Sequence, residues 1–290
     1  MPTQPGPIHR TMRTSLFAVP YHLGRKDIGV GRGPRHLLAD AGDARHEIHP
    51  NTLPDDEVDA IVAVNNALAT AVRRATGSLP IIVSGDCNSC LGTLSGLGSG
   101  TIGIIWFDAH GDMNTPETSP SGFFDGMSIS IALGECYPGV WSQLGKTNCV
   151  PAANVLLVAT RDLDPLERPR IERSQVRMIP PAEMETGLAP RLDALAERVS
   201  EVYLHFDLDA LDPEFAPGAG FRCPDGISLA QALEAIAMIG DRFRIRAAAL
   251  TNYNPDYEVD GRTLSAGREL YRAMTSAASS PARNLRPASS

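Results

Sequence analysis

Long apolar runs and an excess of positive charge are both missing from this sequence. No segment approaches the roughly 18 uninterrupted apolar residues of a membrane span, and residues 1–13 lack the apolar stretch of a secretory signal. Lysine and arginine together number 26 against 34 aspartates and glutamates, a net charge of −8 that disfavours binding to nucleic-acid phosphates. We therefore expect a cytoplasmic protein with neither a membrane nor a nucleic-acid partner.

Cysteine is sparse as well. The five residues are scattered along the chain: Cys87, Cys90, Cys136, Cys149 and Cys223. An odd number without regular spacing is not typical of a disulfide framework, so we expect reduced thiols. Cys87 and Cys90 form a C-x-x-C pair without a thioredoxin-like setting, and we interpret Cys90 as a small core residue.

The length and composition indicate an ordinary globular enzyme domain. The chain has 290 residues, of which 43% are hydrophobic, enough to fill a sizeable core. We assign residues 1–275 to one domain. Residues 276–290 are rich in Ala, Ser, Pro and Arg, and we expect them to form a flexible tail.

Short apolar runs alternate with amphipathic stretches along the chain. The predicted strands are Thr14–Val19, Leu79–Ser84, Ile102–Asp108, Val155–Ala159, Arg177–Ile179, Glu201–Asp207 and Arg246–Thr251. The predicted helices are Glu57–Thr76, Ala189–Val199 and Leu229–Ile239, with start signals at Asp55 and Asp56, at Pro190 and at Ser228. Continuous apolar strands that alternate with helices are typical of a mostly parallel sheet in an α/β/α sandwich. Ligands of such sheets gather at the carboxyl ends of the strands.

Carboxylates follow two of these strands. Asp108, His110 and Asp112 come after one, and Asp207 and Asp209 end another. Residues two apart in extended backbone share a face, so each set can project together. A single D-x-D could merely cap a turn, but two such clusters buried together need cations to neutralise them. Oxygen-rich ligands suit two divalent metal ions, Mn²⁺ first and Fe²⁺, Co²⁺ or Zn²⁺ as alternatives, which would activate a water for hydrolysis.

The motif D-A-H-x-D followed by D-x-D-x-x-D-P resembles the ureohydrolase (arginase/agmatinase) family of binuclear manganese amidinohydrolases, and the similarity extends along nearly the whole chain. The glycine-rich segment 29–34 is similar to the family's loop after its first strand. The resemblance implies an arginase-like fold, a homo-oligomer, and metal ligation by the five residues of the two clusters.

The resemblance also implies an amino-acid substrate. Residues 114–122 are similar to an arginase stretch that grips the substrate α-carboxylate, and residues 161–167 to a stretch that faces the α-ammonium group. The implied carboxylate contacts are Asn114, Ser119 and Ser121, and the implied ammonium contacts are Asp164 and Glu167. Each stretch alone could be an ordinary turn or helix start, but together they favour an α-amino acid over a simple amine such as agmatine.

The sequence departs from the family pattern at the reacting end. Cys87 stands where the family has a histidine ligand, Asp125 where it has a proton-shuttle histidine, and Asn252 where it has a glutamate that pairs with guanidinium. A threonine of the same pocket aligns with Phe221.

These departures change the expected chemistry. Cys87 either binds as a thiolate, softer and more anionic than imidazole, or stays a neutral thiol and leaves one metal weakly held. Asp125 can act as general acid or base if burial raises its pKa, and protons could be delivered by Asp112 or Asp125. Asn252 cannot balance the charge of a guanidinium, which disfavours plain arginine.

A cysteine in the ligand position also partly resembles the hydroxyarginine amidinohydrolase branch of the family. We therefore predict metal-dependent hydrolysis of a C–N bond in the guanidino-type side chain of an arginine-like amino acid, with Nω-hydroxyarginine as a candidate. The alternatives are a degenerate ureohydrolase that binds metal or ligand without catalysis, and a hydrolase of another amidino or formimino amino acid.

Overall fold

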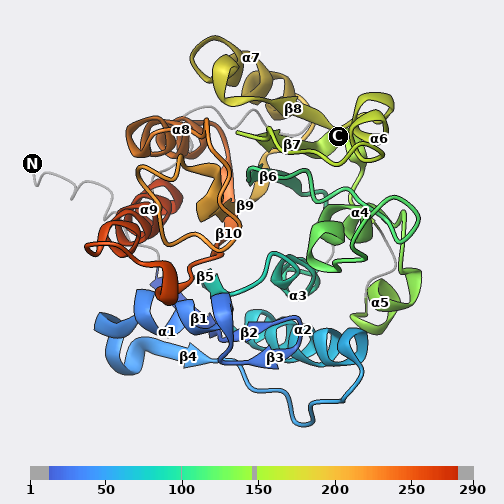
Figure 1. Ribbon diagram of the computed structural model, residues 1–290, viewed down its shortest axis with the longest axis vertical. Coiled ribbons are helices and arrows are strands. Elements are labelled where there is room, and N and C mark those ends of the chain that lie inside the picture. The colour runs from blue at the N-terminus through green and yellow to red at the C-terminus, as the bar shows by residue number, and fades with distance from the viewer. Residues whose placement is uncertain (1–12, 99, 146–148, 280–290) are drawn as a thin grey trace, which may run out of the picture.

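The computed structural model describes residues 13–98, 100–145 and 149–279. An eight-stranded sheet with the order β4-β1-β5-β10-β9-β6-β7-β8 forms the centre of this part, and its neighbouring strands are parallel. Helices cover both of its faces (Figure 1). The predicted α/β/α sandwich is thereby confirmed.

The element bounds follow. The strands are β1 (Arg13–Val19), β2 (Tyr21–His22), β3 (Arg25–Lys26), β4 (Arg45–Glu47), β5 (Ser78–Ser84), β6 (Gly103–Phe107), β7 (Val155–Val158), β8 (Arg177–Ile179), β9 (Glu201–Asp207) and β10 (Arg244–Thr251). The helices are α1 (Gly33–Leu37), α2 (Glu57–Arg74), α3 (Ser89–Gly96), α4 (Ser128–Leu133), α5 (Pro138–Gln143), α6 (Arg168–Arg173), α7 (Met184–Ala196), α8 (Leu229–Arg242) and α9 (Arg262–Ser279).

Two apolar cores lie on opposite faces of the sheet. One joins alternate strand residues to α1, α7, α8 and α9, and the other joins the intervening residues to α2, α3, α4 and α5. In β9, for example, Leu204 and Phe206 belong to the first core and Tyr203 to the second. Burial on both faces explains why the strands appear in the sequence as continuous apolar runs.

The predicted strands all form, with bounds that differ by at most two residues. Two helix starts also agree with the prediction: the Asp56 side chain caps α2, and Ser228 forms a capping box with Gln231 at α8. The short strands β2, β3 and β4 have too few residues to show a periodic pattern.

The prediction for α7 was wrong at its start. Pro190 lies inside the helix, which begins at Met184. Met184, Leu188, Leu192 and Leu195 recur at helical spacing and are buried, so packing of this face outweighs the proline.

The end of the domain also differs from the expectation. Helix α9 runs to Ser279, past the expected boundary at residue 275, because Leu270, Met274 and Ala278 continue its buried face. Residues 280–290 of the expected tail lie outside the described residues. None of the helices in the described ranges has the length and apolar character needed to cross a bilayer.

Candidate metal centre and substrate site

The four strand ends at the middle of the sheet lie side by side. Strands β5, β10, β9 and β6 are consecutive neighbours. Thr251 is in register with Asp207, and Phe206 with both Leu250 and Phe107. The residues that follow these strands therefore meet at one place, as predicted from the sequence.

The predicted carboxylate ligands are buried together at this place. Asp108, Asp112, Asp207 and Asp209 are all at most 6% exposed. His110 Nδ1 lies 3.2 Å from Asp108 Oδ1 and 3.3 Å from Asp209 Oδ2. Donor atoms of Asp108, His110 and Asp209 all lie within 4.8 Å of one another, so these three side chains could hold a divalent cation.

The buried carboxylates of this cluster are stable in their ionised form only if positive charge lies near them. Burial, followed by the charge of Asp209, raises the pKa of Asp207 to about 7. Burial and the charge of Asp108 raise the pKa of Asp112 well above its usual range. Burial alone would lower the pKa of His110, but the carboxylates of Asp209 and Asp108 outweigh it and raise that pKa. Among the described residues, His110 is the one basic side chain within ion-pair distance of these carboxylates.

Asp112 supplies a separate indication of a missing partner. Within the described ranges, its Oδ2 atom is one of the few buried side-chain oxygens without a hydrogen-bond partner. Its backbone has a positive φ of 50°, a conformation that Asp tolerates better than most residues. A buried carboxylate oxygen without a donor is costly unless a cation or a proton occupies it. The donor set thus fits the divalent ions that the sequence predicted.

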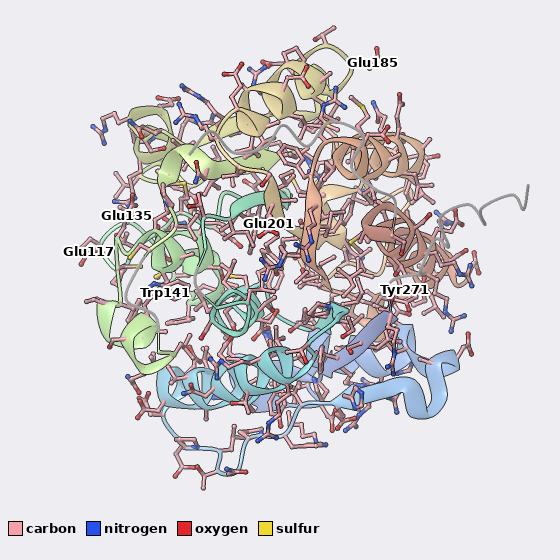
Figure 2. The ribbon with its side chains drawn as sticks, turned by 180° about the vertical axis from the view of Figure 1, so that it is seen from behind. Glu117, Glu135, Trp141, Glu185, Glu201 and Tyr271 are labelled. Atoms are coloured by element: carbon pink, nitrogen blue, oxygen red, sulfur yellow. The ribbon has the colours of Figure 1, made fainter. Side chains whose placement is uncertain are left out.

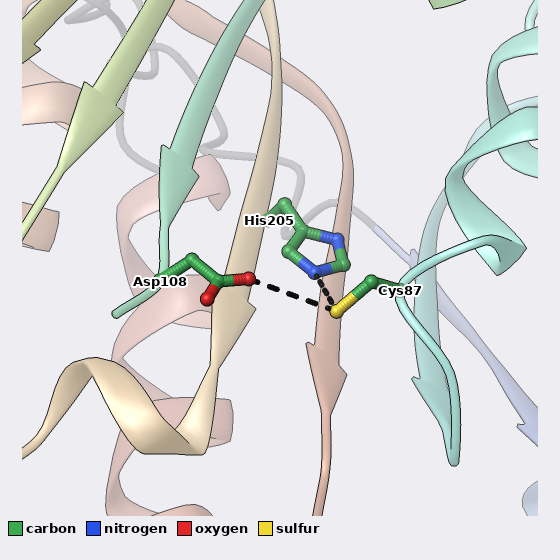
Figure 3. A group of neighbouring side chains, drawn as sticks. All are labelled: Cys87, Asp108 and His205. Carbon is green, nitrogen blue, oxygen red and sulfur yellow. Dashed lines mark hydrogen bonds between the residues drawn. The ribbon is translucent and has the colours of Figure 1, made fainter. Parts of the chain in front are cut away.

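Cys87 points into the same cluster from the loop that precedes α3. Its Sγ atom lies 3.1 Å from Asp207 Oδ2. It also lies 3.8 Å from Asp108 Oδ2 (Figure 3). Burial, and then the charge of Asp207, raises the pKa of the thiol well above its usual range. Cys90, by contrast, is a residue of α3 and is fully buried in the apolar core, which agrees with its interpretation as a core residue.

His205 joins this group although it was not among the predicted ligands. Its Nε2 atom lies 3.3 Å from Cys87 Sγ and 3.3 Å from Thr251 Oγ1. Burial lowers the pKa of this imidazole well below its usual range. The available signal was its place two residues before Asp207, which puts both side chains on one face of β9.

Asp125 holds the loop that carries Cys87. Its Oδ2 accepts the backbone N–H of Cys87 at 3.2 Å, and its Oδ1 accepts the backbone N–H of Asn88 at 2.7 Å. Burial, followed by the charge of Asp86, raises the pKa of Asp125 well above its usual range. Both oxygens are occupied, so the structure gives this residue a positioning function beside the acid–base function expected from the sequence.

Asn252 faces the carboxylates. Its Nδ2 donates to Asp207 Oδ1 at 2.7 Å and to Asp209 Oδ2 at 2.9 Å, while its Oδ1 accepts the N–H of Gly220 at 3.1 Å. The side-chain amide thus orients two predicted metal ligands, and both of its hydrogens are engaged there.

The residues expected at the amino-acid end form a second cluster. Asn114 Nδ2 donates to Asp164 Oδ2 at 2.8 Å. Glu167 accepts the N–H of Met113 at 2.8 Å and that of Asp164 at 3.3 Å. These contacts join the loops after β6 and β7, and Glu167 lies against Gly111, the residue after His110. The His110 side chain is 34% exposed.

The two predicted serines are placed differently. The hydroxyls of Ser119 and Ser121 accept backbone N–H groups of Gly122 and Phe123, and Ser121 is exposed. Both serines lie in the loop after β6 that also carries Asn114, and their contact with the substrate carboxylate stays a prediction.

An aromatic rim lies beside Asp86 and the Cys87 loop. The Phe221 ring lies 5.4 Å from that of Phe123 and 6.3 Å from that of His22, measured between centroids. His22 Nδ1 lies 2.7 Å from Asp86 Oδ1. Sequence reasoning missed His22, because the two-residue strand β2 that carries it has no recognisable pattern.

Comparisons with known proteins agree with this arrangement. The family model "Arginase family" matches residues 13–276. The arginase of Bacillus subtilis is 30% identical over 285 residues, covering 90% of this chain and 96% of that protein. Its crystal structure superposes with a TM-score of 0.81 over 91% of this chain and 98% of the other.

Two further solved structures are similar. That of Entamoeba histolytica arginase in complex with L-ornithine is 25% identical, with a TM-score of 0.79 over 92% of this chain and 99% of the other. The formimidoylglutamase of Bacillus subtilis is 18% identical and shares the fold, with a TM-score of 0.73 over 91% of this chain and 87% of the other. The buried carboxylates at the strand ends, the match over residues 13–276 and the 30% identity agree with one another, and the chain belongs to the arginase family of ureohydrolases.

Proposed function

We propose that this chain hydrolyses a C–N bond in the guanidino-type side chain of an arginine-like amino acid, with two divalent metal ions, Mn²⁺ first, as cofactors. The observation that carries the proposal is the proximity of two clusters. The buried Asp108–His110–Asp209 group could hold a cation, and Glu167 of the Asn114–Asp164–Glu167 group lies against Gly111, the residue after His110. The first suits hydrolysis and the second suits a zwitterionic amino acid.

Each group of residues has its own task in this proposal. When bound, the ions would lower the pKa of a water and so supply a nucleophile near neutral pH. Asp108, His110, Asp112, Asp207 and Asp209, with Cys87, would hold them, and Asn252 keeps two of these carboxylates oriented. Asp164 and Glu167 would receive the substrate ammonium group, and Asn114 would donate to its carboxylate.

Proton transfer is assigned mainly to Asp112. Its Oδ2 atom has no hydrogen-bond partner among the described residues, so it can accept a cation or a proton. Both Asp125 oxygens already accept hydrogen bonds from residues 87 and 88. We infer that Asp125 acts chiefly by fixing the Cys87 loop.

Asn252 favours Nω-hydroxyarginine over arginine as the substrate. A carboxylate at this position would balance a guanidinium charge, but the Asn252 amide is neutral and already donates to Asp207 and Asp209. An N-hydroxyguanidine is less basic and needs such an anion less. A formimino amino acid remains a second candidate for the same reason.

The test offers L-arginine, Nω-hydroxy-L-arginine, agmatine and N-formimino-L-glutamate to the full-length protein loaded with Mn²⁺. We expect release of ornithine from the first two, faster from the hydroxylated one, and no turnover of agmatine. D164N should raise KM by about 10–100-fold with kcat retained, because it removes a charged partner of the ammonium group. D193N, on an exposed carboxylate paired with Arg242, is the matched control.

Other results would contradict the proposal. Turnover of agmatine alone would refute an amino-acid substrate. Fewer than one tightly bound ion per chain, with no hydrolysis of any of the four compounds, would favour the non-catalytic alternative. The homo-oligomer and the cytoplasmic location stay predictions, which sedimentation and cell fractionation can check.

A further inference from the structure

A histidine that the family's ligand set leaves out lies against Cys87. His205 Nε2 is 3.3 Å from Cys87 Sγ, and donor atoms of Cys87, Asp108 and His205 all lie within 4.8 Å of one another (Figure 3). All three side chains are buried, and they come from three different strand ends. This is a second ligand group, distinct from Asp108–His110–Asp209.

The His205 ring is held in one orientation. Its Nδ1 atom lies 2.9 Å from the Tyr203 hydroxyl, and its face stacks on Trp106 with 3.5 Å between centroids and 7° between planes. In the tautomer that carries its proton on Nδ1, His205 donates to the Tyr203 hydroxyl and Nε2 presents its lone pair to Cys87. Metal-binding histidines are commonly fixed in this way by a partner on the other ring nitrogen.

Asp108 belongs to both ligand groups. Its Oδ1 atom faces His110 at 3.2 Å, whereas its Oδ2 atom faces Cys87 at 3.8 Å and accepts the Trp106 indole N–H at 3.2 Å. One carboxylate could therefore contribute an oxygen to each of two neighbouring ions.

The two groups differ in chemistry. Asp108, His110 and Asp209 offer two carboxylates and one imidazole, a hard set that suits Mn²⁺. Cys87 and His205 add sulfur and nitrogen to Asp108, a softer set that suits Zn²⁺, Co²⁺ or Fe²⁺.

We propose that His205 is a metal ligand and that, with Cys87 and Asp108, it forms a site selective for a softer ion than its neighbour. The imidazole that is missing from the loop after β5, where Cys87 stands, is supplied instead by β9. This inference rests on the proposed function only in assuming a metal centre; it concerns which residues bind the ion.

Cobalt(II) is the probe, because a cysteine thiolate bound to it gives a near-ultraviolet charge-transfer band. The full-length protein is stripped with a chelator and titrated with Co²⁺. We expect the band in the wild type and in H110Q, and none in C87S. In H205Q the Co²⁺ affinity of the band-forming site should fall at least about 100-fold, since loss of a ligand exceeds the 10–100-fold effect of an outer partner.

Two controls keep the result interpretable. H49Q removes an exposed histidine and should change nothing. Because His205 is buried in the core, H205Q could fail to fold, and Y203F then tests the same site by removing only the partner of Nδ1. It should weaken Co²⁺ binding by about 10–100-fold.

A second measurement needs no change at His205. X-ray absorption at the zinc edge of H110Q, loaded with one equivalent of Zn²⁺, should show one sulfur and one imidazole on the same ion. Sulfur without imidazole, no sulfur at all, or unchanged Co²⁺ affinity in a folded H205Q would overturn the proposal. Cys87 and His205 would then be a hydrogen-bonded pair of the core.

This test separates the two proposals. A band that depends on His205, without hydrolysis of any guanidino compound, would overturn the proposed function and leave the ligand assignment standing. If the protein hydrolyses a guanidino compound but binds Co²⁺ equally well without His205, the proposed function stands and the ligand assignment of His205 is overturned.

Discussion

The two ends of strands β9 and β10 differ in their charged side chains, which are paired and partly exposed at one end and buried at the other. At the amino end, Glu201 (labelled in Figure 2) pairs with Arg244 at 2.9 Å and with Arg246 at 2.5 Å. All three side chains are partly exposed. At the carboxyl end of the same strands, Asp207 and Asp209 are buried and receive hydrogen bonds from the neutral Asn252.

Ion pairs like those at the amino end are typical of an ordinary protein surface, whereas buried carboxylates like those at the carboxyl end are typical of a functional site. Charges paired at a wet surface contribute little to stability and are easily replaced. Buried carboxylates that raise one another's pKa destabilise the metal-free protein, and such groups are typical of functional sites. Unpaired buried charge thus lowers the stability of the carboxyl end, as expected if that end binds a cation, whereas the amino end carries no such cost.

The largest effect is expected from D112N at the carboxyl end. The amide keeps the shape of the side chain and tolerates the positive φ, but its nitrogen cannot ligate a cation. Metal affinity and hydrolysis should each fall more than about 100-fold, beyond the effect of losing an outer partner of a ligand. Calorimetric titration with Mn²⁺ and steady-state kinetics measure the two losses.

The matched substitution D193N lies outside both strand ends, on a side chain that is 65% exposed and paired with Arg242. It should leave metal affinity unchanged. Equal metal affinities of D112N and wild type would remove Asp112 from the metal centre.

The pH dependence of stability should come next in size. The folded-state pKa of Asp207 is about 7, above its usual value of 3.8. Between these values the folded protein keeps a proton that the unfolded chain has released, so the free energy of unfolding falls as pH rises. Asp207 alone should contribute a drop of about 4 kcal/mol in the metal-free protein, at 1.36 kcal/mol per pKa unit, and the raised pKa values of Asp112 and Asp125 act in the same direction.

Urea unfolding of chelator-treated protein at several pH values measures this slope. With saturating Mn²⁺ the slope should change sign, because binding requires deprotonated ligands and strengthens as pH rises. If the free energy of unfolding of the metal-free protein does not change with pH, the charges of the carboxylates at the carboxyl end must be balanced within the protein itself.

The smallest effect is expected at the amino end. E201Q removes both ion pairs with Arg244 and Arg246, and should lower the free energy of unfolding by about 1 kcal/mol or less. High salt should shrink this difference, since it screens exposed charges. Metal affinity and hydrolysis should not change, and a loss of either in E201Q would contradict the separation of the two ends.

The features that could be predicted from the sequence are those that leave a pattern within one segment of the chain. The strands of the central sheet were recognisable because burial on both faces leaves an apolar run in the chain itself. Helix α7 was misjudged at Pro190, where packing of Met184 and Leu188 outweighs a local signal. Helix α9 was missed although its buried face is a local pattern, in which Ala266, Leu270 and Met274 recur at helical spacing.

The features of the candidate site also fall into those that are local in the sequence and those that depend on contacts between distant segments. The sequence by itself determined that aspartates and a histidine follow the strands at positions 108–112 and 207–209, because their spacing is local. Only the tertiary structure decided that His205 meets Cys87, that Asn252 donates to the carboxylates, and that Asp125 holds the Cys87 loop. Each of these contacts joins residues far apart in the chain. Their partners depend on the strand order β5-β10-β9-β6, which brings distant segments together and which no local pattern encodes.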